Sequence, residues 1–277
     1  MSDHMSWLQA IILGISQGLT EFLPISSTAH EMIINHLIGW KDAGAAFTAF
    51  TQIGTETAVV IYFRKDIVDI ISKWTQSLFN KQLRRHPHAR MGWFVILGTA
   101  PIALFGVLFK DAIEGSLRNL WVVSATLIVV GVLLWLADVK AKHVKTEDDL
   151  NFGESTVFGL GQALALIPGV SRSGATISAG LFMGYKREVA ARYAFLLAIP
   201  AVFASALFQV PNISQDDFVN WPATIVATIV AFVVGYIVIA QLMKYLATKT
   251  FLPFVIYRLA LGVILIGLLA TNTISAT

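Results

Sequence analysis

Six apolar stretches, each close to the roughly 20 residues that a helix needs to cross a bilayer, constrain the fold of this chain most strongly. They cover residues 47–63, 91–109, 120–137, 189–208, 222–243 and 252–270. Hydrophobic residues make up 56% of the chain and charged residues only 13%, with a mean hydropathy of +0.70, which lies outside the usual range of soluble globular domains. The sequence therefore predicts an all-α polytopic membrane protein with six transmembrane helices.

Two further apolar stretches, residues 6–38 and 155–184, are interrupted near their middles by Pro24 and by Pro168-Gly169. Proline disfavours helical geometry in the residue before it, so each stretch is expected to contain two short helices and a break. Non-helical backbone inside a membrane is tolerated only where it is buried in protein or faces a water-filled cavity. We therefore predict two re-entrant helix-loop-helix hairpins whose breaks form one divided site.

The two hairpins share a pattern. When Gln17 is aligned with Gln162, Ser26-Ser27-Thr28 fall opposite Ser171-Arg172-Ser173. Each hairpin is followed by three predicted spans, and because three is an odd number, the second copy must lie upside down relative to the first. The sequence thus predicts a single membrane domain, 1–277, arranged as an inverted-topology repeat: a first repeat at 1–137 (hairpin 6–38 plus three spans), a cytoplasmic linker at 138–154, and a second repeat at 155–277 (hairpin 155–184 plus three spans).

The distribution of charge predicts the orientation. Fourteen of the twenty basic residues lie in loops that share one side in this topology, between residues 64 and 90, 138 and 154, 184 and 188, and 244 and 251. By the positive-inside rule this side is cytoplasmic, so both termini are expected outside. No Lys or Arg precedes Lys41, so the basic start of a cleaved signal peptide is missing. The chain has no cysteine, which excludes disulfides, thiol catalysis and thiolate metal sites.

The first break carries an acid and an imidazole in an otherwise apolar hairpin. Ionisable groups inside a membrane are costly and mark functional sites by default, so we expect Glu21 and His30 to be functional. Gln17, four residues before Glu21, shares its helix face. The alternatives are that Glu21 snorkels to an interface and that His30 is a structural imidazole. Thr28 and Glu31 have capping-box spacing, which predicts that Thr28 is the N-cap of a new helix.

Arg172 is the charged residue of the second break. A guanidinium deep in an apolar hairpin costs at least ~3 kcal/mol on insertion scales, so it requires an anionic partner. Its five-donor fork suits phosphate oxygens, and two helix N-termini converging at the breaks would direct free N–H groups at the same anion. The alternative is a salt bridge to Glu21 or Glu56, which is compatible with a phosphate site.

Small polar residues flank both breaks, and we predict that they bind the anionic ligand; the set is Gln17, Ser26, Thr28, Ser171, Ser173, Gly174 and Thr176. The alternative is that the hydroxyls only cap helices or pack against neighbours. Glu56, Arg192 and Arg258 are ionisable residues within predicted spans. The role of Glu56 is open, and Arg258 is either functional or snorkels back to the cytoplasmic face.

The motifs QGLTEFLPISSTAH, from Gln17 to His30, and PGVSRSGAT, from Pro168 to Thr176, resemble the two signatures of the undecaprenyl-diphosphatase family, the bacitracin-resistance family of bacterial inner-membrane enzymes. The resemblance spans the whole chain. It implies hydrolysis of undecaprenyl diphosphate to undecaprenyl phosphate and inorganic phosphate, which recycles the lipid carrier for cell-wall polysaccharide synthesis and confers bacitracin resistance. It also implies a site open to the periplasm.

Carried over by position, the resemblance implies that Glu21, His30 and Arg172 are essential, that Ser27 is close to the chemistry, and that Ser173 and Thr176 lie near the phosphates. The predicted catalytic set is therefore His30, Glu21, Ser27 and Arg172. Diphosphate hydrolysis needs charge stabilisation and a positioned nucleophile. Either His30 attacks or activates water, oriented by Glu21, or Ser27 attacks with His30 as its base. We favour His30 as the direct participant, with Ser27 assisting.

The first motif departs from the family pattern at two positions, because Gln17 stands where many members have Glu and Ala29 where Gly is frequent. Glu21 must then carry the charge of this motif alone. The resemblance implies a divalent cation, Mg²⁺ or Ca²⁺, which we expect to be held mainly by substrate phosphates and water, with Glu21 as its protein ligand. Expected partners are the polyprenyl diphosphate and membrane lipids, no nucleic acid is expected, and a homodimer is left open.

Two other functions share features with this sequence. The type-2 phosphatidic acid phosphatases also act on lipid diphosphates, but their Ser-Arg motif is followed by a catalytic His, and this chain has no His after His143. Inverted repeats with broken helices are also typical of secondary transporters, so a transporter or a polyprenyl-phosphate flippase is the alternative.

Overall fold

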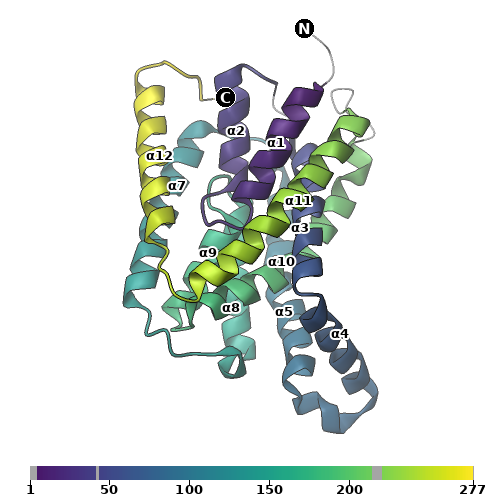
Figure 1. The fold of residues 1–277 in the computed structure, drawn as a ribbon. Coiled ribbons are helices and arrows are strands. Elements are labelled where there is room, and N and C mark those ends of the chain that lie inside the picture. The colour runs from purple at the N-terminus through teal and green to yellow at the C-terminus, as the bar shows by residue number, and fades with distance from the viewer. Residues whose placement is uncertain (1–4, 42–43, 214–219, 277) are drawn as a thin grey trace.

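The computed structural model describes residues 5–41, 44–213 and 220–276, and within these ranges the regular structure is helical apart from one isolated bridge between Lys145 and Tyr185. Figure 1 shows the arrangement, with η denoting 3-10 helices. The helices are, in order, α1 (Trp7–Thr20), α2 (Ser27–Ile38), α3 (Gly44–Tyr62), α4 (Arg64–Phe79), η1 (Lys81–Arg85), α5 (Pro87–Leu108), α6 (Lys110–Glu114), α7 (Leu120–Lys140), η2 (Glu147–Asp149), α8 (Phe152–Ala163), η3 (Leu164–Leu166), α9 (Arg172–Phe182), α10 (Arg187–Ile213), α11 (Trp221–Leu246) and α12 (Leu252–Ala270).

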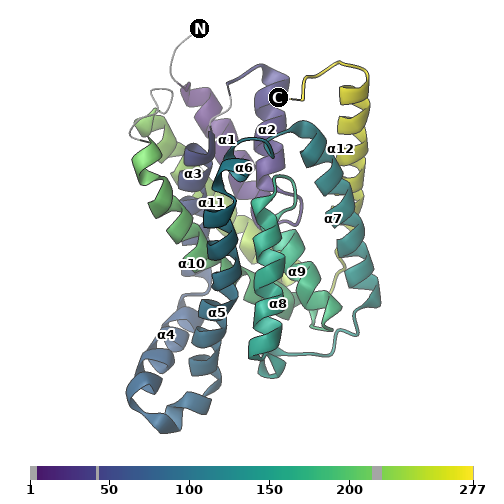
Figure 2. The same ribbon diagram turned by 180° about the vertical axis from the view of Figure 1, so that it is seen from behind.

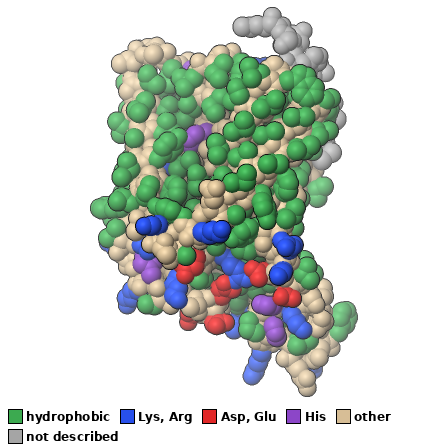
Figure 3. All heavy atoms as spheres, in the orientation of Figure 1, with side chains coloured by type: hydrophobic (Ala, Val, Ile, Leu, Met, Phe, Trp, Pro, Cys, Tyr) green, Lys and Arg blue, Asp and Glu red, His purple; other side chains and the backbone are tan. Residues whose placement is uncertain are grey.

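Five of the described helices, α5, α7, α10, α11 and α12, are long and apolar enough to cross a membrane. Their outward faces are apolar as well, since Leu104, Val129 and Val263 are all more than half exposed. Apolar side chains cover the body of the molecule, and charged side chains gather at its lower end (Figure 3). The predicted all-α class is confirmed, and these helices fit a multi-pass membrane protein. The sixth predicted span, 47–63, coincides with α3, where Gln52 and Glu56 lower the hydropathy.

The segment 64–90, predicted only as a basic loop, contains a helix that the sequence analysis missed. Helix α4 (Arg64–Phe79) follows α3 almost directly and packs against α5, and the two project together from the lower end of the molecule (Figures 1 and 2). Hydropathy alone could not reveal α4, because polar residues alternate with its apolar ones at helical spacing and leave its average near zero.

Each interrupted stretch forms two helices separated by a break. The first break, residues 21–26, separates α1 from α2, and the second, residues 167–171, separates η3 from α9. Close approaches at glycine hold the helices that lead into the breaks. A Cβ on Gly14 of α1 would lie 2.6 Å from the Ala227 carbonyl oxygen of α11, and one on Gly159 of α8 would lie 2.3 Å from the Gly98 oxygen of α5. These contacts leave no room for a side chain, so the helices entering both breaks are tightly positioned.

The two breaks end in the same local geometry. Ser26 and Ser171 have positive φ angles of 74° and 70°, a region that serine rarely adopts. Each is an N-cap: Ser26 Oγ accepts from the Ala29 amide at 3.3 Å, and Ser171 Oγ accepts from the Gly174 amide at 3.1 Å. The two serines are the residues that the sequence alignment of the hairpins placed opposite each other.

The predicted N-cap at Thr28 is wrong. Helix α2 already begins at Ser27, and Ser26 caps it. Glu31, predicted to reach back to the helix start, instead accepts from the Thr48 hydroxyl of α3 at 2.7 and 2.8 Å. The prediction failed for two reasons. The positive φ of Ser26 brings its own side chain to the Ala29 amide, and the Glu31 carboxylate is bonded to the buried Thr48 hydroxyl of another helix.

Candidate active site

An ion pair between Glu21 and Arg172 joins the two breaks. Glu21 is the C-cap of α1 and Arg172 is the first residue of α9, so the charges come from opposite halves of the chain. Arg172 donates to Glu21 Oε1, and both side chains are largely buried. The salt bridge weighed from the sequence is therefore present, and Glu21 does not snorkel to an interface. In a buried site each charge offsets the desolvation cost of the other.

The second carboxylate oxygen of Glu21 is also occupied. Glu21 Oε2 accepts from Gln17 Nε2 at 2.7 Å and from Ser27 Oγ at 2.7 Å. Glu21 therefore receives an amide, a hydroxyl and a guanidinium, and it holds Ser27 at the start of α2. The side-chain amide of Gln17 acts as a hydrogen-bond donor here, a role that an ionised Glu at this position cannot take.

His30 makes different contacts. Its Nδ1 lies 2.7 Å from the Ser26 carbonyl oxygen, and its Nε2 lies 2.6 Å from the Tyr257 hydroxyl of α12. A carbonyl only accepts, so Nδ1 donates, and in the neutral ring Nε2 accepts from Tyr257. The two rings also stack, 5.6 Å apart and 6° from parallel. His30 thus orients the Ser26 backbone, whereas Ser27 Oγ is bonded to Glu21.

Tyr257 is a residue that sequence reasoning missed. It directly precedes Arg258 in the last predicted span, and nothing in its local pattern distinguishes it from an interfacial tyrosine. Only the packing of α12 brings its hydroxyl to His30.

Ser171 and Ser173 connect the second break to the first. Their hydroxyls lie 3.1 Å apart, and Ser173 Oγ donates toward the carbonyl oxygens of Leu23 at 3.2 Å and Glu21 at 3.4 Å. Ser173 therefore fastens the start of α9 to the backbone of the first break. The hydroxyl of Thr176, one turn further, is buried and has no hydrogen-bond partner in the described ranges.

Arg258 is fully buried and serves both breaks. It donates to Pro24 at 2.9 Å, to Gly169 at 3.0 Å and to Val170 at 3.1 Å, all through carbonyl oxygens of the breaks. It also donates to two carbonyls of α7 at 3.2 Å. The idea that Arg258 snorkels to the cytoplasmic face is therefore wrong. Breaks leave carbonyl groups without helical partners, and a five-donor guanidinium satisfies several at once.

Glu56, on α3, is a second buried acid near the ion pair. It is 1% exposed and interacts electrostatically with Arg172 and Glu21. Its Oε1 has no hydrogen-bond partner among the described residues. Arg172 therefore pairs with Glu21 rather than with Glu56.

A cavity of about 340 Å³ opens beside the ion pair. Its polar end is lined by residues of the two breaks and the helices that follow them: Glu21, Ser26, Ser27, Thr28, Ser171 and Arg172. Its walls are mainly apolar and come from α5, η3 and α10, with Ile102, Leu166 and Ala201 as examples. Of the predicted site residues, Gln17, His30, Ser173, Gly174 and Thr176 are not among the described residues that line it.

A family model described as "Bacitracin resistance protein BacA" matches residues 10–264. The chain belongs to this family. A protein of Streptomyces coelicolor named "Undecaprenyl-diphosphatase 2" is 53% identical over 283 residues, covering 98% of this chain and 97% of the relative. The "Undecaprenyl-diphosphatase" of Thermobifida fusca is 54% identical over 271 residues, covering 98% and 93%, and that of Nocardioides sp. is 54% identical over 273 residues, covering 98% and 100%.

The described residues of this BacA-family chain offer few ligands for a cation. Within the described ranges no three His, Cys, Asp or Glu side chains cluster as metal ligands. Glu21 is the acid among the cavity-lining residues, and both its oxygens already accept from Gln17, Ser27 and Arg172. A hard divalent cation takes six or more oxygen ligands, so most of them would have to come from a bound substrate and water.

Proposed function

We propose that this chain is an undecaprenyl-diphosphatase, an enzyme that hydrolyses undecaprenyl diphosphate to undecaprenyl phosphate and inorganic phosphate. The observation that carries the proposal is the buried Glu21–Arg172 pair, placed at the polar end of a cavity with apolar walls. The family and the names of relatives more than 50% identical support the same reaction. The activity would recycle the lipid carrier for cell-wall polysaccharide synthesis and confer bacitracin resistance.

Binding of the diphosphate begins with an exchange of partners. The guanidinium of Arg172 presents two parallel N–H donors that match phosphate oxygens as well as they match a carboxylate. When phosphate takes this partner, Glu21 keeps its bonds to Gln17 and Ser27 and becomes an available acceptor beside the Ser27 hydroxyl. The resting ion pair therefore holds both groups in position before the substrate arrives.

The nucleophile that the geometry favours is Ser27 rather than His30. Ser27 lines the cavity and donates to a carboxylate at 2.7 Å, while both nitrogens of His30 are engaged by Ser26 and Tyr257. In this mechanism Ser27 Oγ attacks the terminal phosphorus, its proton passes to Glu21, and the phosphorus–oxygen bond to undecaprenyl phosphate breaks. Water then hydrolyses the phosphoserine, releasing inorganic phosphate and a proton. Arg172 stabilises the charge on the transferred phosphoryl group in both steps.

The test of this assignment is to acid-quench purified enzyme during turnover of a polyprenyl diphosphate labelled in its terminal phosphate. Label on Ser27 is the expected result, together with a loss of activity of at least about 10³-fold in Ser27→Ala. Thr75→Ala, at an exposed hydroxyl of α4 that bonds only to the backbone of its own helix, is the control. If the protein carries no label and the Ser27→Ala variant is active, Ser27 is not the nucleophile. Absence of phosphate release from wild-type protein would refute the activity itself.

For the topology, we propose six spans and two re-entrant hairpins in an inverted repeat, set in the bacterial inner membrane with both termini outside. The equivalent cap geometry of Ser26 and Ser171 supports the repeat. Since the chain has no cysteine, single-cysteine variants can be read without background. In intact cells an impermeant thiol reagent should label Ser116→Cys, in the loop after α6, and should reach Lys142→Cys, after α7, only when the membrane is opened. The reverse pattern would overturn the orientation.

The divalent cation expected from the family, Mg²⁺ or Ca²⁺, is proposed to enter with the phosphate oxygens of the substrate, with Glu21 as the nearest protein carboxylate. When bound, it would neutralise phosphate charge. We expect a chelator to abolish phosphate release and added Mg²⁺ or Ca²⁺ to restore it. Full activity in excess chelator would show that the reaction needs no divalent cation. Undecaprenyl diphosphate and membrane lipids are the proposed partners, and light scattering of the protein in detergent would distinguish a monomer from the homodimer that the sequence leaves open.

A further inference from the structure

The cavity extends well beyond the ion pair. Helix α5 lines it from Thr99 to Val107, eight residues apart, which corresponds to about 12 Å along a helix axis, and Lys110 at the start of α6 continues the lining. Helix α10 lines it from Ala201 to Phe208. Both walls run from the breaks toward the upper end of Figure 1, where α1 begins and α12 ends. The long axis of the cavity therefore leads from the reacting groups to the end of the molecule proposed to face outside.

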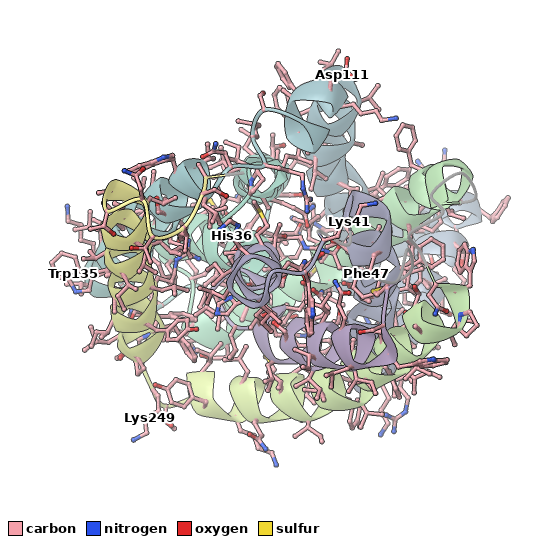
Figure 4. The ribbon with its side chains drawn as sticks, turned by 90° about the horizontal axis from the view of Figure 1, so that it is seen from above. His36, Lys41, Phe47, Asp111, Trp135 and Lys249 are labelled. Carbon is pink, nitrogen blue, oxygen red and sulfur yellow. The ribbon has the colours of Figure 1, made fainter. Side chains whose placement is uncertain are left out.

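Lys110 stands at the far end of this cavity. It follows α5 and begins α6, and its Nζ lies 4.9 Å from the centroid of the Phe208 ring of α10. The contact joins the start of α6 to α10 at this end of the cavity, which we call its mouth. Figure 4 looks down on the upper end and shows Asp111, the neighbour of Lys110, at one edge of the bundle.

Lys110 and Arg172 are the two cationic residues among the described residues that line the cavity. Arg172 is neutralised by Glu21, whereas the ammonium of Lys110 forms no ion pair in the described ranges and rests on an aromatic face. A cation over an exposed aromatic ring is held only weakly and exchanges readily for a charged partner. The cavity thus has an uncompensated positive charge at its mouth and a compensated one at its polar end.

We propose that Lys110 captures the diphosphate headgroup of the substrate at the mouth of the cavity, leaving Phe208 for the phosphate oxygens before the headgroup reaches Arg172. This inference rests on the proposed activity and adds a binding residue to it. A diphosphate carries several negative charges, so it is attracted by Lys110 from a distance and must lose water only afterwards, at the ion pair. The prenyl chain meanwhile remains beside the apolar residues of α5 and α10. The contribution of Lys110 is therefore to association and not to the chemical step.

The experiment compares Lys110→Gln with wild type on a polyprenyl diphosphate in detergent, over a series of NaCl concentrations. Expected results are a kcat/KM about 10-fold lower at low salt, a kcat within about 2-fold of wild type, and a weaker dependence of kcat/KM on salt. Lys110→Arg should retain most of the effect of the native residue. Lys249→Gln, at an exposed lysine in the loop between α11 and α12, is the matched control and should behave as wild type.

Three outcomes would overturn the proposal: a kcat/KM for Lys110→Gln equal to that of Lys249→Gln, an unchanged salt dependence, or a loss confined to kcat. A preserved kcat itself demonstrates a folded variant. Failure of the proposed activity would be separately visible, because wild-type protein would then release no phosphate in the same assay.

Discussion

The two breaks end in the same cap geometry but supply opposite charges. Ser26 and Ser171 share a positive φ and a capping role, so both breaks end one helix and start another in the same way. The first break provides a carboxylate, and the second provides the guanidinium that pairs with it. The cap geometry is the same in both because the N–H groups at a buried helix end need hydrogen-bond partners, whichever side chains surround them. The side chains differ because like charges at one point would repel, whereas complementary ones hold the breaks together.

The largest expected effect comes from breaking this complementarity. Arg172→Ala should lower kcat/KM at least about 10³-fold, because the phosphoryl charge loses its main donor. It should also destabilise the protein by about 3 kcal/mol, since Glu21 is left buried without its partner. Phosphate release and thermal unfolding in detergent measure the two effects.

A double variant, Arg172→Ala with Glu21→Ala, separates the two effects. It should recover much of the lost stability and none of the activity, because the unpaired charge is removed together with the site. A double variant as unstable as Arg172→Ala would show that the pair does not act as a unit.

The second prediction concerns Arg258, the residue that donates to carbonyls of both breaks. Arg258→Met should destabilise the protein by roughly 3 kcal/mol or more, because several buried carbonyls of the breaks and α7 lose their donor at once. The unfolding midpoint in detergent measures this, with Lys249→Met as a surface control. An unchanged midpoint would mean that the breaks do not depend on Arg258.

The third prediction tests whether the two capping serines contribute equally to the free energy of unfolding. Ser26→Ala and Ser171→Ala should each cost about 1 kcal/mol of stability through the lost cap. The corresponding Gly variants should cost less, because glycine adopts a positive φ without strain. Unfolding midpoints of the four variants provide the comparison. An Ala variant no less stable than its Gly counterpart at either site would contradict the strained geometry.

The smallest effect is expected at the acid that does not bridge the breaks. Glu56→Gln should leave kcat/KM within about 2-fold of wild type and change stability by at most about 1 kcal/mol, because Arg172 pairs with Glu21 and Glu56 Oε1 has no hydrogen-bond partner among the described residues. Glu21→Gln, assayed for phosphate release in parallel, should lose most activity. Equal losses in the two variants would place Glu56 in the site.

Local patterns in the sequence were enough to find both breaks. Pro24 and Pro168 mark them because proline acts on its own neighbours, and the apolar runs mark the long helices because hydropathy is summed over adjacent residues. The alignment of the hairpins even identified Ser26 and Ser171 as equivalent. The local patterns gave wrong predictions where a residue distant in the chain determines the contact of a side chain. Glu31 bonds to Thr48 instead of capping its own helix, and Arg258 points inward and donates to carbonyls of three segments.

By itself, the sequence determined that this is an all-α protein of the BacA family with two interrupted apolar stretches and with long helices that fit a multi-pass membrane protein, because composition, proline breaks and motifs are properties of contiguous residues. Tertiary structure alone decided which groups meet: Ser27 with Glu21, His30 with Tyr257, and Lys110 with Phe208. These pairs depend on how helices far apart in the chain pack, and the distance between two side chains in space is not encoded in the pattern around either one.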